Sequence, residues 1–230
     1  LIVKVEAISV NPIDTKVRKG QAGDAPARVL GWDVAGTVVA LGSEASLFKV
    51  GDAVYYAGSL VRDGANSELH AVDERIVGHK PQSLSMEQAA ALPLTTITAW
   101  EALFERLGID RDGAHAGRRL LIIGGAGGVG SIAIQLASKL ARLEVIATAS
   151  RPESGAWCRD LGAAHIVDHG GDIPAQLRSL GIPAVDYVLC LNSTDAHFAA
   201  MAEAVAPQGK ICTIVENKAP LAVDPLFRKS

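Results

Sequence analysis

The sequence has few cysteines, no excess of positive charge and no recognisable targeting segment. Its 230 residues include three cysteines, Cys158, Cys190 and Cys212, which stand far apart without a C-x-x-C pair. This spacing favours reduced core thiols over disulfides or a cysteine-based metal site. The net charge of −3 gives no sign of nucleic-acid binding. The opening residues, LIVKVEAISV, show no signal-peptide pattern. We therefore expect a cytoplasmic globular protein that binds neither nucleic acid nor a membrane.

An uncharged stretch of nineteen residues lies between Arg119 and Lys139 and approaches the length of a membrane-spanning helix. Five glycines fall in its middle, and each costs a soluble helix interior about 1 kcal/mol relative to alanine. The stretch is better explained as a buried strand at residues 120–123, a glycine turn, and a helix with apolar residues every three or four positions. The predicted apolar face of this helix comprises Val129, Ile132, Ala133, Leu136 and Leu140.

The glycine turn carries the pattern G-x-G-x-x-G at Gly125, Gly127 and Gly130, directly after a strand and at the start of a helix. The first glycine permits a tight turn, the second lets the backbone approach a pyrophosphate, and the third allows close helix–strand packing. Unpaired amides at the helix start, around Gly128 and Val129, favour phosphate charge. The pattern predicts dinucleotide binding, with a simple tight turn as the alternative.

Two domains are expected, a β-rich one at residues 1–93 and a dinucleotide-binding one at 94–230. The first contains short β-like segments that glycines separate, and this pattern predicts a barrel-like domain. The β-like segments are LIVKVEAISV, GTVVALG, DAVYYAG, SELHAV and RIVGH. Ser85 is a predicted helix N-cap with Gln88 three residues on, and that short helix ends near Pro93. A second helix is expected at about 95–107.

From Arg119 onward, predicted strands and helices alternate, which implies a doubly wound parallel sheet of the α/β class. Strands are expected at 119–124, 143–148, 165–168, 185–190 and 210–215, and helices near 129–141, 153–161, 173–180 and 195–205. Five strands are visible where a complete dinucleotide fold has six. We therefore expect a chain truncated at both ends, with a final strand near Val215 that is unpaired on one side.

Several motifs in order resemble the medium-chain dehydrogenase/reductase superfamily over essentially the whole chain. They are AISVNPIDTKVRKG, VLGWDVAGTVVALG, FKVGDAVYYAG, AAALPLTTITAWEAL and GGAGGVGSIAIQLA. The sequence is most similar to the zinc-independent quinone oxidoreductase branch, in the subgroup of zinc-type alcohol dehydrogenase-like proteins. The resemblance implies a GroES-like catalytic domain before the nucleotide domain, a later return of the chain to the catalytic domain, and a homodimer for the full-length protein.

Departures from the zinc enzymes of this superfamily disfavour a metal. Where they carry a cysteine three residues before an aspartate, this chain has Asn11 before Asp14, and where they carry G-H-E it has Gly31, Trp32 and Asp33. The four-cysteine lobe is missing, and the six histidines show no paired ligand spacing. Without a Lewis acid, alcohol oxidation is disfavoured, and Trp32 is expected to pack a turn or line a pocket.

The cofactor preference is predicted from the end of the second strand of the nucleotide domain. NAD-binding sites carry an acidic residue about twenty residues after the glycines, whereas this chain has Thr148, Ala149, Ser150 and Arg151. Arg151 can pair with a 2′-phosphate and Ser150 can donate a hydrogen bond to it, so NADPH is favoured. The alternative is that Arg151 is only a solvated residue before a helix. His169 matches a position where the resembling reductases carry a tyrosine near this phosphate, and a plain surface histidine is the alternative.

A reduced nicotinamide donates a hydride, and a pocket without zinc suits a quinone or an α,β-unsaturated carbonyl substrate. Asn11 is the candidate polar group near nicotinamide or substrate, unless it only forms an Asn-Pro turn. Thr98 matches a threonine beside the nicotinamide ring in the resembling family, or bonds its own helix backbone. Asn192 and Val215 follow the fourth and fifth strands, where ligands lie in such sheets. No residue is assigned as a general acid.

Two other functions remain open. The resemblance also covers non-catalytic NADPH-binding proteins, used as lens crystallins or RNA-binding proteins, although the acidic net charge gives RNA binding no support. A zinc alcohol dehydrogenase is disfavoured because two metal ligands are replaced.

Overall fold

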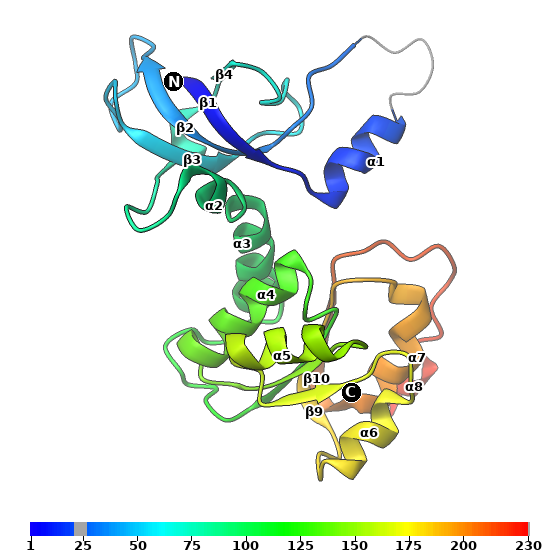
Figure 1. Ribbon diagram of the computed structural model, residues 1–230. Coiled ribbons are helices and arrows are strands. Elements are labelled where there is room, and N and C mark those ends of the chain that lie inside the picture. The colour runs from blue at the N-terminus through cyan, green and yellow to red at the C-terminus, as the bar shows by residue number, and fades with distance from the viewer. Residues whose placement is uncertain (21–26, 230) are drawn as a thin grey trace. The chain divides into compact units, whose positions relative to one another are not determined.

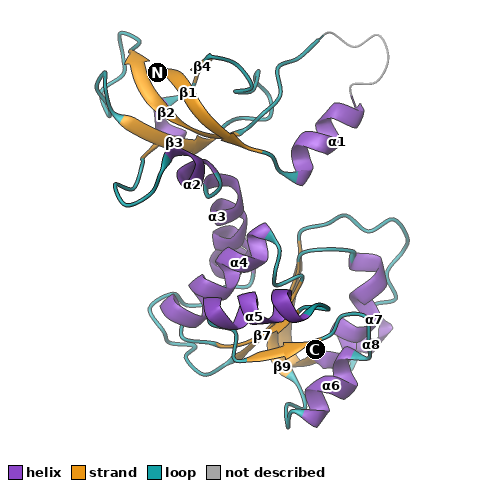
Figure 2. Cartoon of the chain, in the orientation of Figure 1, coloured by secondary structure: helices purple, strands orange, loops and turns teal. Residues whose placement is uncertain are grey.

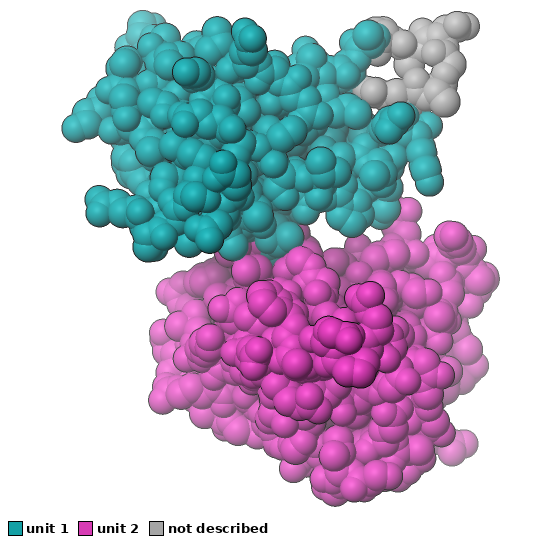
Figure 3. All heavy atoms as spheres, viewed as in Figure 1, with its two compact units in different colours: residues 1–95 teal, residues 96–230 magenta. Residues whose placement is uncertain are grey.

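The structure is a computed structural model that describes residues 1–20 and 27–229. The chain forms two compact units, Leu1–Thr95 and Thr96–Ser230, which Figure 3 shows in different colours. The division lies inside a helix, α3 (Pro93–Trp100), two residues beyond the 93/94 boundary expected from the sequence.

Unit 1 is built on an antiparallel sheet with the strand order β4-β1-β2-β3-β5. Figure 1 labels β1 to β4 of this sheet. Its strands are β1 (Ile2–Ser9), β2 (Asp33–Ala40), β3 (Ala53–Ala57), β4 (Leu69–Ala71) and β5 (Gly78–His79). Its helices are α1 (Pro12–Gly20), α2 (Met86–Ala90) and a 3₁₀ turn, η1 (Glu74–Ile76). The expected β-rich character of this part of the chain is therefore present.

The two faces of this sheet bury different residues because side chains alternate along a strand. Val34 and Val38 of β2 belong to a core cluster on one face, whereas Ala35 packs on the other face against Ala89 and Ala90 of α2. Helix α2 begins with the predicted capping box: Ser85 Oγ accepts the Gln88 N–H, and Gln88 Oε1 accepts the Ser85 N–H.

Two local predictions in unit 1 were wrong or incomplete. The segment RIVGH was expected to be a strand, but only Gly78–His79 pairs with β3, and the residues before it form the 3₁₀ turn, which the Asp73 carboxylate caps. Helix α1 was not indicated by the sequence, because an Asn-Pro pair is also typical of turns. Pro12 suits the first helical position, where no N–H is needed.

Unit 2 contains the predicted doubly wound sheet. Its strand order is β10-β9-β6-β7-β8, and all pairs are parallel. The strands are β6 (Arg119–Ile123), β7 (Glu144–Thr148), β8 (His165–Val167), β9 (Val185–Cys190) and β10 (Val205–Thr213). The helices that connect them are α4 (Gly128–Gln135), α5 (Pro152–Leu161), α6 (Ile173–Ser179) and α7 (Thr194–Ala204), with α8 (Asp224–Phe227) near the end. Two π-helical segments, η2 (Glu101–Arg106) and η3 (Leu136–Leu140), extend α3 and α4.

Alternate residues of each strand pack into two separate cores, one on each face of the sheet. Leu120 and Ile122 of β6 pack in one cluster with α4 and α5, whereas Leu121 and Ile123 pack in the other with α6 and α7. Figure 2 shows α4 and α5 side by side, and the Trp157 indole Nε1 donates to Ser131 Oγ at 2.9 Å between them. Burial on both faces is typical of parallel sheets.

Strand β10 starts five residues earlier than expected, at Val205. The pairing register with β9 breaks between Val205 and Lys210, where Pro207 has no N–H and Gln208 has a positive φ of 61°. These residues concealed the start of the strand. As expected, β10 is an edge strand, paired only with β9 in the described part of the chain.

The uncharged stretch between Arg119 and Lys139 is a strand, a turn and a helix, as predicted. Among residues 1–20 and 27–229, no helix has both the length and the apolar character that crossing a bilayer requires.

Candidate functional site

The glycine turn of unit 2 joins β6 to α4 and is held by the end of β7. Gly124 has a φ of +88°, and its N–H donates to Thr148 Oγ1 at 3.0 Å. The Gly125 N–H donates to the Thr148 carbonyl at 3.2 Å. A single buried threonine on the neighbouring strand therefore fixes the first two residues of the turn.

The three glycines of the motif have different surroundings. A Cβ on Gly125 would lie 2.7 Å from Ala147 Cβ, and one on Gly130 would lie 2.4 Å from the carbonyl oxygens of both Gly124 and Gly125. A Cβ on Gly127 would meet only the Gly124 oxygen, at an ordinary 3.4 Å. Packing within the protein thus requires glycine at 125 and 130, whereas Gly127 borders space that the protein leaves open.

The start of α4 offers backbone donors to that open space. Gly127 is the N-cap residue and has no side chain to cap the helix, while the first amides of any helix lack an intrahelical acceptor. Gly128 is exposed and Val129 half-buried. The helix dipole adds partial positive charge at this end. The glycine turn at residues 124–127 and the uncapped first turn of α4, which we together name the glycine cradle, therefore fit a phosphate or pyrophosphate group.

Ser150 and Arg151 lie just beyond the carboxyl end of β7, and both are exposed. Arg151 is the N-cap residue of α5, and its guanidinium makes a long contact of 3.4 Å with Ser154 Oγ. Because the end of β7 also holds the glycine turn through Thr148, these two side chains are neighbours of the cradle. They remain available to an anionic ligand.

His169 follows β8 in a turn that Gln176 of α6 fixes. Gln176 accepts the Asp168 N–H at 2.7 Å and donates to the Asp168 carbonyl at 2.8 Å. The His169 Nδ1 atom is buried and has no hydrogen-bond partner in the described part of the chain. His197 of α7 packs edge-on at 6.2 Å between ring centroids, and burial, followed by the nearby His169, lowers the pKa of His197. The orphaned nitrogen at this edge of the sheet is consistent with a ligand partner.

Asn192 and Val215 follow β9 and β10 at the same edge of the sheet. Side-chain atoms of Asn192 lie 3.7 Å from the place of a Cβ on Gly124, so Asn192 borders the glycine turn directly. The Val215 carbonyl accepts the Thr194 hydroxyl at 2.6 Å. Thr98 of α3 lines a cavity of about 420 Å³ together with Thr213 and Ile214, just before Val215. The structure thus brings most of the predicted cofactor residues together at the carboxyl ends of the parallel strands.

Asn11 takes part in a buried polar corner of unit 1. Its Nδ2 donates to Asp33 Oδ2 at 2.9 Å, and its backbone N–H donates to Asp14 Oδ2 at 2.8 Å. The Leu94 N–H donates to Asp33 Oδ1 at 2.8 Å. Asp33 is completely buried, and this burial raises its pKa to about 6 despite both hydrogen bonds. Asn11 therefore directly precedes α1 and ties the start of this helix to β2.

Trp32 is buried at the position where the resembling zinc enzymes carry a histidine ligand. Its Nε1 donates to the Ser59 carbonyl at 3.1 Å, and the Arg28 guanidinium lies 5.6 Å from its ring centroid. Trp32 thus packs against the turn at Ser59, which is one of the two roles expected from the sequence. No group of three histidine, cysteine or acidic side chains arranged to hold a metal occurs within residues 1–20 and 27–229.

Four side chains have roles in these sites that the sequence did not indicate. Thr148 holds the glycine turn, Thr194 and Asp195 hold the backbone after β10, and Asp33 is the hub of the polar corner. Each acts on residues at least 21 positions away, so a local motif gives no signal for it. A cavity of about 920 Å³ between α7 and residues 219–229 lies apart from the glycine turn.

Comparison with known proteins connects both units to dehydrogenases. Residues 1–93 match the alcohol dehydrogenase GroES-like domain family, and residues 128–230 match the zinc-binding dehydrogenase family. A zinc-type alcohol dehydrogenase-like protein of Staphylococcus aureus is 46% identical over 94% of this chain. The chain spans 64% of the length of that relative.

Solved structures show the same likeness. A candidate zinc-dependent alcohol dehydrogenase from Rhizobium etli is 48% identical and has a TM-score of 0.92, with all of this chain and 67% of the other covered. A quinone oxidoreductase from Pseudomonas syringae is 30% identical with a TM-score of 0.81, over 99% of this chain and 69% of that one. A mycobacterial protein in complex with NADPH is 28% identical with a TM-score of 0.81, over 100% and 70%.

Proposed function

Because the chain belongs to the medium-chain dehydrogenase/reductase superfamily, we propose that it is part of an NADPH-dependent oxidoreductase. The proposed reaction is zinc-independent reduction of a quinone or an α,β-unsaturated carbonyl compound. The observation that carries this proposal is the glycine cradle, which is open at Gly127, lies at an uncapped helix start and adjoins Ser150 and Arg151.

The cradle suits the pyrophosphate of a dinucleotide. Amides at Gly128 and Val129 would donate to the phosphate oxygens, while Gly127 allows the close approach. Arg151 would pair with a 2′-phosphate, with Ser150 donating a further hydrogen bond. The orphaned Nδ1 of His169 supplies another polar group at this edge of the sheet. A structural relative in complex with NADPH supports the same cofactor.

A bound NADPH supplies the hydride, and the protein's residues bind and orient the reactants. A zinc-free site is proposed because the side chains at the family's ligand positions are engaged elsewhere: the Asn11 amide bonds Asp33, and the Trp32 ring is buried in its turn. An electron-poor acceptor needs no Lewis acid, which favours a quinone or an enone. Structural relatives that are quinone oxidoreductases support this substrate class.

The test is a comparison of NADPH and NADH oxidation with 1,2-naphthoquinone and with a simple enone, before and after dialysis against a chelator. We expect faster turnover with NADPH, no loss of activity after dialysis, and no stoichiometric zinc by elemental analysis. NADPH binding without turnover of any acceptor would favour a non-catalytic binding role. Zinc retained through dialysis would refute the metal-free mechanism.

A further inference from the structure

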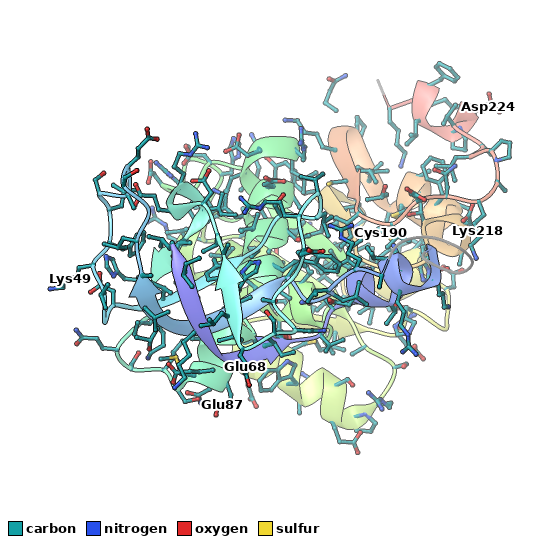
Figure 4. All side chains as sticks on the ribbon, turned by 90° about the horizontal axis from the view of Figure 1, so that it is seen from above. Lys49, Glu68, Glu87, Cys190, Lys218 and Asp224 are labelled. Carbon is teal, nitrogen blue, oxygen red and sulfur yellow. The ribbon has the colours of Figure 1, made fainter. Side chains whose placement is uncertain are left out.

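Two side chains in the first turn of α7 anchor the backbone that follows β10. The buried Thr194 donates from Oγ1 to the Val215 carbonyl. The Asp195 carboxylate accepts the Lys218 N–H at 2.9 Å through Oδ2 and the Ala219 N–H at 3.1 Å through Oδ1. Lys218 is labelled in Figure 4. The segment Val215–Ala219, which we name the β10 loop, is thus fixed at three of its five residues.

Electrostatics favour the anchored state. The two backbone amides, first that of Lys218 and then that of Ala219, hold the pKa of the Asp195 carboxyl below its usual range, so this group is ionised at neutral pH. Negative charge in the first turn of α7 is also favoured by the helix dipole. The anchor therefore persists over the neutral pH range in which the protein would bind a dinucleotide.

The same turn contacts the glycine cradle on its other side. Leu191 Cβ lies 3.5 Å, and the Asn192 side chain 3.7 Å, from the place of a Cβ on Gly124. Ser193, between Asn192 and the two anchors, adopts a left-handed conformation with φ of 37°. Such strain in a residue other than glycine persists only where the surroundings enforce it, and it concentrates at functional sites. Residues 192–195 therefore connect the cradle to the β10 loop.

The strand order indicates which end of a dinucleotide would meet this loop. Along the carboxyl edge of β10-β9-β6-β7-β8, the cradle follows β6 and the proposed 2′-phosphate contacts follow β7. A dinucleotide with its adenosine end over β7 and its pyrophosphate at β6 extends its other end over β9 and β10. The nicotinamide half would therefore lie against the β10 loop.

We propose that Thr194 and Asp195 are positioning residues that hold the β10 loop ready for the nicotinamide half of the cofactor. The inference rests on the proposed function. A loop that is already ordered in the free protein loses little conformational entropy when the ligand binds. Affinity for the group that the loop contacts is therefore higher. Loss of the anchors then weakens binding of the nicotinamide half and leaves the adenosine half unaffected.

The test compares two ligands by calorimetry: NADPH, and 2′,5′-ADP, which has no nicotinamide. Thr194→Val and Asp195→Ala each remove one anchor. Because a loop without its anchor must be ordered at binding, we expect NADPH affinity to fall by about tenfold. The affinity for 2′,5′-ADP should stay within about twofold of wild type. Thr194→Ser keeps the hydroxyl and should retain NADPH affinity.

Asp110→Ala is the matched control. The Asp110 carboxylate also accepts a backbone N–H, that of Ala114 at 2.8 Å, but it lies before β6, at the opposite end of the strands. This variant should bind both ligands as wild type does. If the anchor variants lose affinity for both ligands equally, or for neither, the positioning role is refuted. If the wild type binds neither ligand, the proposed function fails and this inference fails with it.

Discussion

The polar corner of unit 1 and the glycine cradle of unit 2 present their polar groups in opposite ways. In the corner, the Asp33 carboxylate accepts two protein donors, and Asp14 accepts the N–H at the start of α1. In the cradle, the helix start has no side-chain cap and Gly127 borders open space. The corner satisfies its own polar groups, whereas the cradle leaves donors for a ligand.

This difference separates two kinds of candidate residue. A buried polar group that is fully paired within the protein stabilises the fold, and its replacement changes stability first. Donors that are left without protein partners in a shaped concavity are typical of an anion site. By this criterion, the cradle is the stronger candidate for binding and Asn11 the weaker one.

The sharpest contrast is between a helical glycine of the cradle and a helical glycine outside it. Gly130→Ala would force a methyl group to within 2.4 Å of two backbone oxygens, and such overpacking costs about 1–3 kcal/mol. Gly155→Ala of α5 meets only ordinary contacts at 3.6 Å and beyond, and alanine is favoured over glycine in a helix by about 1 kcal/mol. Because this preference applies to both helical positions, we expect the two variants to differ by the overpacking cost, about 1–3 kcal/mol in unfolding free energy, measured by chemical denaturation. Equal stabilities would show that the backbone around Gly130 shifts at little cost to accommodate the added methyl group.

The corner predicts a pH dependence. Burial raises the pKa of Asp33 to about 6 in the folded protein, so the folded state binds this proton more tightly than the unfolded chain. The contribution of Asp33 to stability is therefore fully present below the unfolded pKa near 4 and is lost as pH rises through 6. At about 1.4 kcal/mol per pKa unit, the loss reaches about 3 kcal/mol.

Asp33→Asn removes this titration. The unfolding free energy of the variant minus that of wild type should rise as the pH increases from 4.5 to 7.5. This trend is expected whether the variant is more or less stable than wild type at any single pH. Thermal unfolding at several pH values measures the difference. A constant difference across this range would mean that Asp33 titrates normally in its corner.

Arg151→Ala tests whether the Arg151 guanidinium, beside the open side of the cradle, binds the 2′-phosphate of NADPH. A hydrogen bond to a charged group contributes about 1.5–3 kcal/mol, so NADPH should bind roughly ten- to a hundredfold more weakly. NADH has no 2′-phosphate, and its affinity should stay nearly unchanged. Fluorescence titration with both cofactors provides the measurement. Equal weakening of both would assign Arg151 a general role in stability or charge.

The sequence predicted features that depend on neighbouring residues. The strand–turn–helix at Leu120–Leu140 and the Ser85 capping box are local patterns, and the structure contains both. The alternation of strands and helices was sufficient to predict the parallel sheet of unit 2. Helix α1 was missed because an Asn-Pro pair also begins turns, and the Asp14 carboxylate that accepts the Asn11 N–H decides between them.

Features that depend on distant residues were not predictable in this way. Asp33 is buried because Asn11 and Leu94 converge on it from 22 and 61 positions away. The Thr194 hydroxyl reaches the Val215 carbonyl, 21 positions away, because β9 and β10 pair side by side. The sequence predicted that a ligand binds at the carboxyl ends of the strands, while the side chains that fix the loops at that edge were found only in the structure.

The smallest expected change in stability belongs to Gly127→Ala, which isolates ligand binding from folding. Glycine is a better N-cap than alanine, but alanine reduces the entropy of the unfolded chain by about 0.4–1 kcal/mol, so the two effects nearly cancel. The position has a φ of −75° and room for a Cβ at 3.4 Å. The unfolding free energy should therefore change by less than about 1 kcal/mol.

The methyl group that Gly127→Ala adds stands where a pyrophosphate would approach. A misfit of about 1–3 kcal/mol should weaken NADPH binding by about tenfold or more. Denaturation and calorimetry on the same preparation measure both quantities, and unchanged NADPH affinity would place the pyrophosphate elsewhere than beside Gly127.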